Sequence, residues 1–162
     1  EKHMLLFIRS GFAYGPAVMN RLADPELHPL FAAVRHLDHE THLYTGFVRF
    51  SIFEEKMYAS ITPKNHVLPL LRPHFCQRFP EESFLIYDKT HQEVLIYEKG
   101  RHLLAALADW HMPEIDEEER AYRKMWQHCY DKMAIESRIN PKLRRNHMPH
   151  RYWPDMTEFQ PE

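Results

Sequence analysis

The 162-residue sequence predicts an α+β protein with an antiparallel sheet of about four strands, arranged as two hairpins and packed with helices from both ends of the chain. In the middle of the chain, apolar and polar residues alternate, which is the period of a β-strand. Towards both ends, apolar residues recur every three or four positions, which is the period of a helix. Because the strand-like segments cluster together, we expect an antiparallel sheet rather than a series of β-α-β units.

The first third of the chain is expected to be helical. Residues Met4–Arg9 read as the end of a helix closed by Gly11, and a short helix follows Gly15. The run Asp24–Glu26 predicts the start of the next helix. Asp24 can cap the N-terminus, Pro25 is favourable in the first turn, and the negative charge of Glu26 interacts favourably with the helix dipole. This helix should stop near Gly46 and bury one apolar stripe. The stripe comprises Leu27, Leu30, Phe31, Val34 and Leu37.

The remaining elements follow from changes of period. The expected strands cover residues 47–52, 58–61, 84–87 and 94–97. A short helix is expected between the two strand pairs, over residues 67–78. The last long helix opens at Asp116, which precedes three glutamates, and runs toward Asn140. It should stop before Pro141, because a proline disfavours helical backbone in the residue that precedes it.

Charge is segregated along a chain that is nearly neutral overall. The net charge is −2 and the pI is about 6.7, which excludes a generally basic nucleic-acid-coating protein. Residues 81–119 hold eleven acidic and three basic side chains, whereas residues 120–153 hold nine basic and two acidic ones. Any nucleic-acid binding must therefore come from a local surface in the second segment.

Residues 141–162 are predicted to form a basic, aromatic C-terminal strap. Pro141, Pro149 and Pro154 stiffen this segment and no glycine loosens it, so we expect it to be ordered. Lysine and arginine side chains donate hydrogen bonds to phosphate, and exposed aromatic rings stack on nucleic-acid bases. The predicted nucleic-acid-binding residues are Lys142, Arg144, Arg145, Arg151, Tyr152 and Trp153. In the alternative interpretation the strap is purely structural and buries Trp153 and Phe159.

Glu136 is predicted to lie in an apolar stripe of the last helix. The stripe comprises Tyr122, Met125, Trp126, Cys129 and Met133. Helical spacing places Glu136 about 40 degrees from Tyr122, so we expect a buried carboxylate paired with Arg144, Arg145 or Arg151. The alternative is a catalytic acid or base.

An enzyme of unknown reaction is the second functional hypothesis, with His74, Glu136, Glu40 and Arg49 in one cleft. His36 and His39 are weak candidates for a metal site, since they lie close on one helix, but no metal and no cofactor is expected. Cys76 and Cys129 are too far apart in the sequence for a cysteine-ligated cluster. The four glycines form no phosphate-binding loop.

Several blocks of the sequence, taken in their order along the chain, carry a family resemblance. The first blocks are Arg9–Phe12 with Gly15, and Glu40–His42 followed by Gly46–Phe50. The central blocks are Asn65, Leu68–Leu71, Pro73–Phe75, Arg78–Pro80 and Ile86–Asp88. The closing blocks are Ile135–Glu136, Arg138, Asn140–Pro141, Met148–Pro149, Arg151–Trp153 and Thr157–Phe159. In this order the blocks resemble a bacterial family of unknown function whose members are labelled as DNA metabolism or DNA repair proteins. Because the order is kept along nearly the whole chain, the resemblance is specific.

The resemblance implies a role and partners, but it carries no established catalytic residues. The resemblance implies that the protein is either a partner of a radical-SAM protein or a segment that is fused ahead of a uracil-DNA-glycosylase-like domain. The family pattern also implies a further segment upstream of Glu1. We therefore expect one α+β domain over residues 1–162 that lacks this segment. A cytoplasmic location and no membrane partner are expected, because no apolar run approaches the length of a membrane span.

Overall fold

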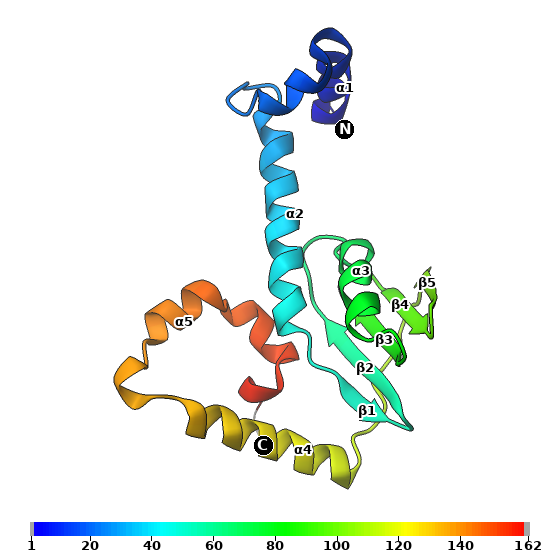
Figure 1. Cartoon of the computed structure of the whole chain (residues 1–162), viewed down its shortest axis with the longest axis vertical. Helices are drawn as coiled ribbons and strands as arrows, with labels where there is room; N and C mark the ends of the chain where they lie inside the picture. The colour runs from blue at the N-terminus through cyan, green and yellow to red at the C-terminus, as the bar shows by residue number, and fades with distance from the viewer. Residues whose placement is uncertain (1, 161–162) are drawn as a thin grey trace. The chain divides into compact units, whose positions relative to one another are not determined.

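The computed structural model describes residues 2–160 and contains two compact units (Figure 1). The first unit ends at His42 and the second begins at Leu43. The boundary lies within the helix α2 (His28–Phe47), so the two units share one helix. No helix among residues 2–160 is both long enough and apolar enough to cross a membrane.

The first unit contains α1 (Lys2–Tyr14), the short 3-10 helix η1 (Gly15–Asn20) and the first part of α2. The prediction that Gly11 closes the first helix is wrong, because α1 continues through it. Gly15 follows the last residue of α1 and has a φ of +58°, the left-handed conformation that glycine adopts without a steric penalty at helix ends.

The start of α2 lies slightly later than the sequence predicts. The Asp24 carboxylate accepts a hydrogen bond from the backbone N–H of Glu26 at 3.0 Å, but the residues after it form a turn and α2 begins at His28. The predicted apolar stripe is only partly buried. Leu27 is 1% exposed, whereas Val34 is 48% exposed.

The second unit is built on a five-stranded sheet in the order β1-β2-β3-β4-β5. The strands are β1 (Ser51–Phe53), β2 (Lys56–Ile61), β3 (Ser83–Asp88), β4 (Glu93–Glu98) and β5 (Arg101–Ala106). The α+β class and the two predicted hairpins, β1–β2 and β3–β4, are confirmed. A fifth strand and a parallel pair, β2–β3, differ from the predicted four-stranded antiparallel sheet.

The parallel pair results from the helix α3 (Leu68–Arg78), which closely matches the predicted helix over residues 67–78. A helix inserted between two strands carries the chain back to the starting edge of the sheet, so the next strand runs in the same direction. Residues Leu68, Leu71 and Phe75 of α3 are buried. The helix therefore lies where the sequence predicts it, whereas the parallel direction of β2 and β3 differs from the predicted antiparallel sheet.

β5 was missed because its sequence does not resemble a strand. Residues 101–106 read RHLLAA, with no alternation of apolar and polar residues and with leucine and alanine, which favour helices. The strand forms because Gly100, with a φ of +90°, turns the chain back along β4. β5 is an edge strand and most of its side chains are exposed.

One continuous core joins α3 to the sheet and extends to the C-terminal segment. Phe50 packs edge-on against Phe75, Phe79 and Phe84, with ring centroids 5.5 to 5.9 Å apart. The fully buried residues of the core include Ala59, Val67, Ile86, Leu95 and Met156.

The C-terminal part of the second unit consists of short helices that return to α4 (Glu117–Met133) (Figure 1). These are η2 (Glu136–Arg138), α5 (Pro141–His147), η3 (His150–Asp155) and η4 (Thr157–Phe159). Asp116 caps α4 as predicted, accepting from the N–H of Glu119 at 2.7 Å. The prediction that this helix runs toward Asn140 is wrong, because Ala134 is already extended. Pro141 begins α5, where its missing N–H has no cost.

Candidate nucleic-acid interface

The predicted strap contains a buried anchor, Tyr152. Its side chain is 1% exposed, and its ring packs against Tyr44 and Phe47 at centroid distances of 5.0 and 5.1 Å. Arg151 lies over the same ring and contacts the Tyr152 hydroxyl. Tyr152 is therefore not available to stack on a base, and its inclusion among the nucleic-acid-binding residues is corrected to a packing role.

Trp153 is half-buried in an aromatic stack that orders the outer part of the strap. Its ring lies 4.3 Å from that of Phe159, with the two planes 16° apart. The Arg144 guanidinium lies 5.3 Å from the Trp153 ring centre and 5.5 Å from that of Phe159. Trp153 also donates its indole N–H to the Met148 carbonyl at 2.9 Å. This packing agrees with the structural interpretation of the strap while leaving the Arg144 charge at the surface.

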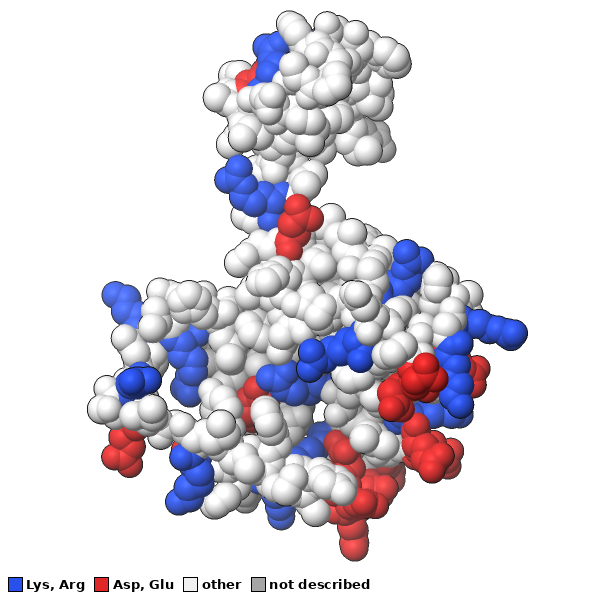
Figure 2. Space-filling model, viewed as in Figure 1, with Lys and Arg blue, Asp and Glu red and all other residues white. Residues whose placement is uncertain are grey.

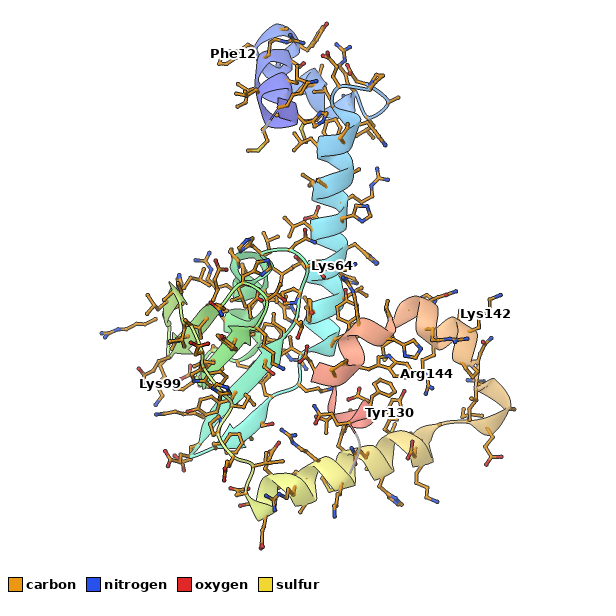
Figure 3. The ribbon with its side chains drawn as sticks, turned by 180° about the vertical axis from the view of Figure 1, so that it is seen from behind. Phe12, Lys64, Lys99, Tyr130, Lys142 and Arg144 are labelled. Atoms are coloured by element: carbon orange, nitrogen blue, oxygen red, sulfur yellow. The ribbon has the colours of Figure 1, made fainter. Side chains whose placement is uncertain are left out.

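An open hollow of about 700 Å³ lies between the second half of α4 and α5, and we call it the α4–α5 hollow. Its apolar lining includes Trp126, Tyr130, Ile135, Ile139 and Leu143. Its basic lining comprises Arg138, Arg144 and His147, and one carboxylate, Asp131, lines it as well. Figure 3 shows the labelled side chains of Tyr130 and Arg144 in the space between the two helices, whereas Lys142 points outward from α5.

The cations around this hollow are not neutralised by ion pairs. Within residues 2–160, no carboxylate forms a salt bridge with Arg138, Lys142, Arg144 or Arg145, all of which are exposed. In Figure 2, lysine and arginine side chains are spread over the part of the unit that contains α5, whereas acidic side chains gather near the start of α4. The acidic cluster therefore lies apart from α5, whereas basic side chains also occur on the side of the unit that holds the sheet (Figure 2).

The predicted arginines converge only in part. Arg144 lines the α4–α5 hollow, whereas Arg145 and Arg151 do not. Arg138 and His147 line it instead, together with Trp126. Trp126 had been assigned to a buried stripe, so its role here was missed. One feature of the sequence does indicate this role: Trp126 lies within the basic segment, residues 120–153.

The face of α4 that packs on the rest of its unit is polar. Glu119 is buried and accepts from the Arg123 guanidinium at 2.8 Å, and Arg123 in turn donates to the Ser51 hydroxyl at 2.5 Å. Gln127 donates to the carbonyl groups of Thr157 and Gln160. The residues of the predicted buried stripe are exposed instead, with Tyr122 at 55%, Met125 at 58%, Trp126 at 46% and Met133 at 80%.

Arg49 forms an ion pair with Glu158. Two hydrogen bonds join the guanidinium to the carboxylate, at 2.6 and 3.1 Å, and the Glu158 side chain is only 1% exposed. Burial opposes ionisation of Glu158, but the hydrogen bonds from Arg49, its own backbone N–H and Trp126 outweigh it, so its pKa lies below the usual value. Arg49 therefore ties the strap to the segment before β1, which is a structural role.

The prediction of a buried Glu136 is wrong. Glu136 lies in η2 and is exposed, and no salt bridge joins it to an arginine within residues 2–160. The error has two physical causes. The helical period was extended past Met133, where α4 ends, and the reference stripe itself faces outward.

The other candidates for catalysis share none of three hollows formed by the described residues. Of His74, Glu136, Glu40 and Arg49, only Arg49 lines one of these three hollows. The buried Nε2 atom of His74, on α3, has no hydrogen-bond partner within residues 2–160. Glu40 lies on α2, is 2% exposed and is engaged by other groups.

Burial raises the pKa of the Cys76 thiol, and the charge of Arg72 only partly offsets this rise. Cys76 is therefore a poor nucleophile.

The two weak metal candidates, His36 and His39, lie on α2 and both are exposed. In the part of the chain that the structure describes, no three His, Cys, Asp or Glu side chains are grouped so as to hold a metal ion. Glu40 and His42 both make other contacts.

Comparison with known proteins places the chain in a family but identifies no relative of known function. No curated protein and no solved structure matches this chain. A family model described as a domain of unknown function, DUF4130, matches residues 1–158, which is nearly the whole chain. The chain therefore belongs to the DUF4130 family.

Proposed function

We propose that this protein is an accessory factor of DNA repair or DNA metabolism that binds nucleic acid through the C-terminal part of its second unit. The observation that carries the proposal is the α4–α5 hollow, in which arginines without carboxylate partners lie beside the exposed ring of Trp126 and the partly buried ring of Tyr130. Phosphate oxygens are the natural partners of such arginines, and bases are the natural partners of such rings. The DNA context rests on the resemblance described above.

A titration of fluorescently labelled DNA at several salt concentrations tests this proposal. Phosphate contacts release counterions, so affinity should fall steeply with salt, by a slope of about −0.9 for each phosphate contact on duplex DNA. Replacing Lys142 and Arg145 with glutamine should weaken binding and reduce the magnitude of this slope by about 2. Both side chains are exposed and take part in no described stacking or ion pair, so the fold should be preserved.

A matched control variant replaces Lys99 and Arg101 with glutamine. These two cations are also exposed, but they lie at the β4–β5 turn, and Figure 3 shows Lys99 on the sheet side of this unit. Affinity and salt slope should match those of the parent. Equal losses in the two double variants would show that net charge, rather than the α5 surface, governs binding.

A protein partner is the second candidate for the same surface. Met133, Ile135 and Ile139 are 80%, 54% and 59% exposed, which is an unusual concentration of apolar side chains at a surface. The resemblance implies either a radical-SAM protein or a uracil-DNA-glycosylase-like domain as this partner. Pull-down with each purified candidate, with Ile139→Asp as the disrupting variant, tests the idea. The enzyme alternative has weaker support, because its four candidate residues share no described hollow.

A further inference from the structure

The shape of the α4–α5 hollow bears on which form of nucleic acid this protein binds. Its volume of about 700 Å³ falls within the range of small-ligand sites and is large enough for a nucleotide base. Most of its lining is apolar, and the arginines are a minority among its residues. A surface that only follows a phosphate backbone needs cations but no apolar hollow.

Trp126 holds a special position beside this hollow. Its ring lines both the α4–α5 hollow and a second, smaller hollow of about 380 Å³ that also contains Arg49 and Arg123. The indole N–H points to Glu158 at 3.3 Å, which fixes the ring, while 46% of the residue stays exposed. A fixed but exposed tryptophan between two hollows is suited to stacking with a base.

Bases of a duplex are not available for this contact. They are stacked on each other and paired, and a base enters a protein hollow only after it has been unstacked. In a single strand this cost is small, and aromatic stacking then contributes to affinity without a sequence requirement. Arg138 and Arg144 line the same hollow, so both can supply the cations that the phosphates next to an inserted base require.

We infer that the protein binds single-stranded nucleic acid, with one base seated in the α4–α5 hollow against Trp126 and with flanking phosphates on Arg138 and Arg144. The inference rests on the proposed function and adds the form of the ligand to it. Apolar lining and unpaired arginines at the same place favour this ligand over an apolar peptide, which would not require the arginines, and over a simple polyanion, which would not require the rings.

The test compares three labelled ligands at one salt concentration. The first is an oligothymidylate of about 12 nucleotides, within the usual range of site sizes. The second is a duplex of the same length, and the third is an abasic strand of the same length, which carries the phosphates without the bases. We expect the oligothymidylate to bind about tenfold more tightly than the abasic strand, in line with the usual effect of base stacking.

Two substitutions of Trp126 separate stacking from structure. Trp126→Leu should lose about tenfold in affinity for the oligothymidylate and leave binding of the abasic strand unchanged. Trp126→Phe keeps an aromatic ring but loses the hydrogen bond to Glu158, so it should retain most of the affinity. A purely structural tryptophan would give equal losses in both variants and on all ligands.

Cys129 provides an independent readout, because it is exposed and lines the same hollow. Bound oligothymidylate should slow the reaction of Cys129 with a thiol reagent, whereas the abasic strand should protect it much less.

Equal affinity for the three ligands would overturn the inference and leave the proposed function intact. Absence of binding to all three at low salt would overturn both. Equal losses with Trp126→Leu and Trp126→Phe would show that the ring acts only through the fold, and the inference would fail.

Discussion

At the scale of single residues, the Arg49–Glu158 pair shows how this protein uses a buried carboxylate. Glu158 comes from the end of the chain, Arg49 precedes β1, and their hydrogen bonds close a long loop. Removing one partner of a buried pair leaves the other charge without compensation. The pair therefore holds the strap in place, a role that sequence reasoning had given to the wrong glutamate.

Glu158→Ala should lower the free energy of unfolding by about 3 kcal/mol, the lower end of the range for a broken buried pair, because Arg49 is partly exposed. Urea denaturation measures this change. Glu136→Ala is the matched control, since Glu136 is exposed and forms no ion pair among the described residues, and it should change stability by less than about 0.5 kcal/mol. A large effect at Glu136 would contradict the helix boundary at Met133.

The same carboxylate predicts a contribution to acid sensitivity. Because the pKa of Glu158 is lower in the folded protein than in the unfolded chain, its ionised form stabilises the fold above the usual glutamate pKa of about 4.3. This stability is lost as the pH falls from there through the folded-state pKa. Urea melts at decreasing pH should therefore show a smaller loss of stability for Glu158→Gln than for the parent. Identical losses would mean that Glu158 does not drive the transition.

The two cysteines are expected to differ in reactivity. Cys129 is exposed, whereas Cys76 is partly buried and its thiol pKa is raised, so less thiolate is present at neutral pH. A thiol-reactive dye at pH 7 should label Cys129 much faster, and peptide mass spectrometry identifies the modified residue. Faster labelling of Cys76 would indicate that α3 opens readily.

At the scale of elements, helix caps and the periodicity of apolar residues explain which parts of the fold the sequence predicts. The Asp116 cap and the α3 boundaries were predicted well, because they depend on local signals. The direction of β3 relative to β2 was not predicted, because two strand pairs were read as separate hairpins without considering that α3 between them acts as a crossover. The buried face of α4 was misassigned because Glu119, Arg123 and Gln127 form the packed stripe. Periodicity arguments assume that the buried stripe is apolar.

Asn140 is predicted to hold α5 beside the hollow. Its side chain accepts from the N–H of Leu143 at 3.0 Å and caps a helix of only seven residues. Such a short helix has little stability of its own, so loss of the cap should matter locally. Asn140→Ala should increase amide hydrogen exchange in α5, while Asn140→Asp should preserve protection. Unchanged exchange in Asn140→Ala would show that packing alone orders α5.

At the scale of the whole molecule, the sequence shows the basic segment but does not predict the hollow beside it. Lys142, Arg144 and Arg145 are exposed near the hollow, as a binding role requires, whereas Tyr152 is an anchor of the core. The hollow depends on the break in α4 after Met133 and on the return of the chain through α5. Tertiary packing determines both the end of α4 and the path of α5, so local sequence patterns do not predict either.

The separation of charge along α4 gives a final prediction about nucleic-acid binding. Glu117 and Glu118 lie at the start of this helix, and Trp126, which lines the α4–α5 hollow, lies nine residues after Glu117, about 14 Å away at 1.5 Å per residue. The Debye length is about 30 Å at 10 mM salt but about 8 Å at physiological ionic strength. Replacing both glutamates with glutamine should therefore strengthen DNA binding at 10 mM salt and leave it unchanged at physiological salt. Asp116 and Glu119 are not substituted, because Asp116 caps the helix and Glu119 accepts a hydrogen bond from Arg123. An equal gain at both salt concentrations would mean that the ligand passes close to the start of α4, and that the binding surface extends well beyond the α4–α5 hollow.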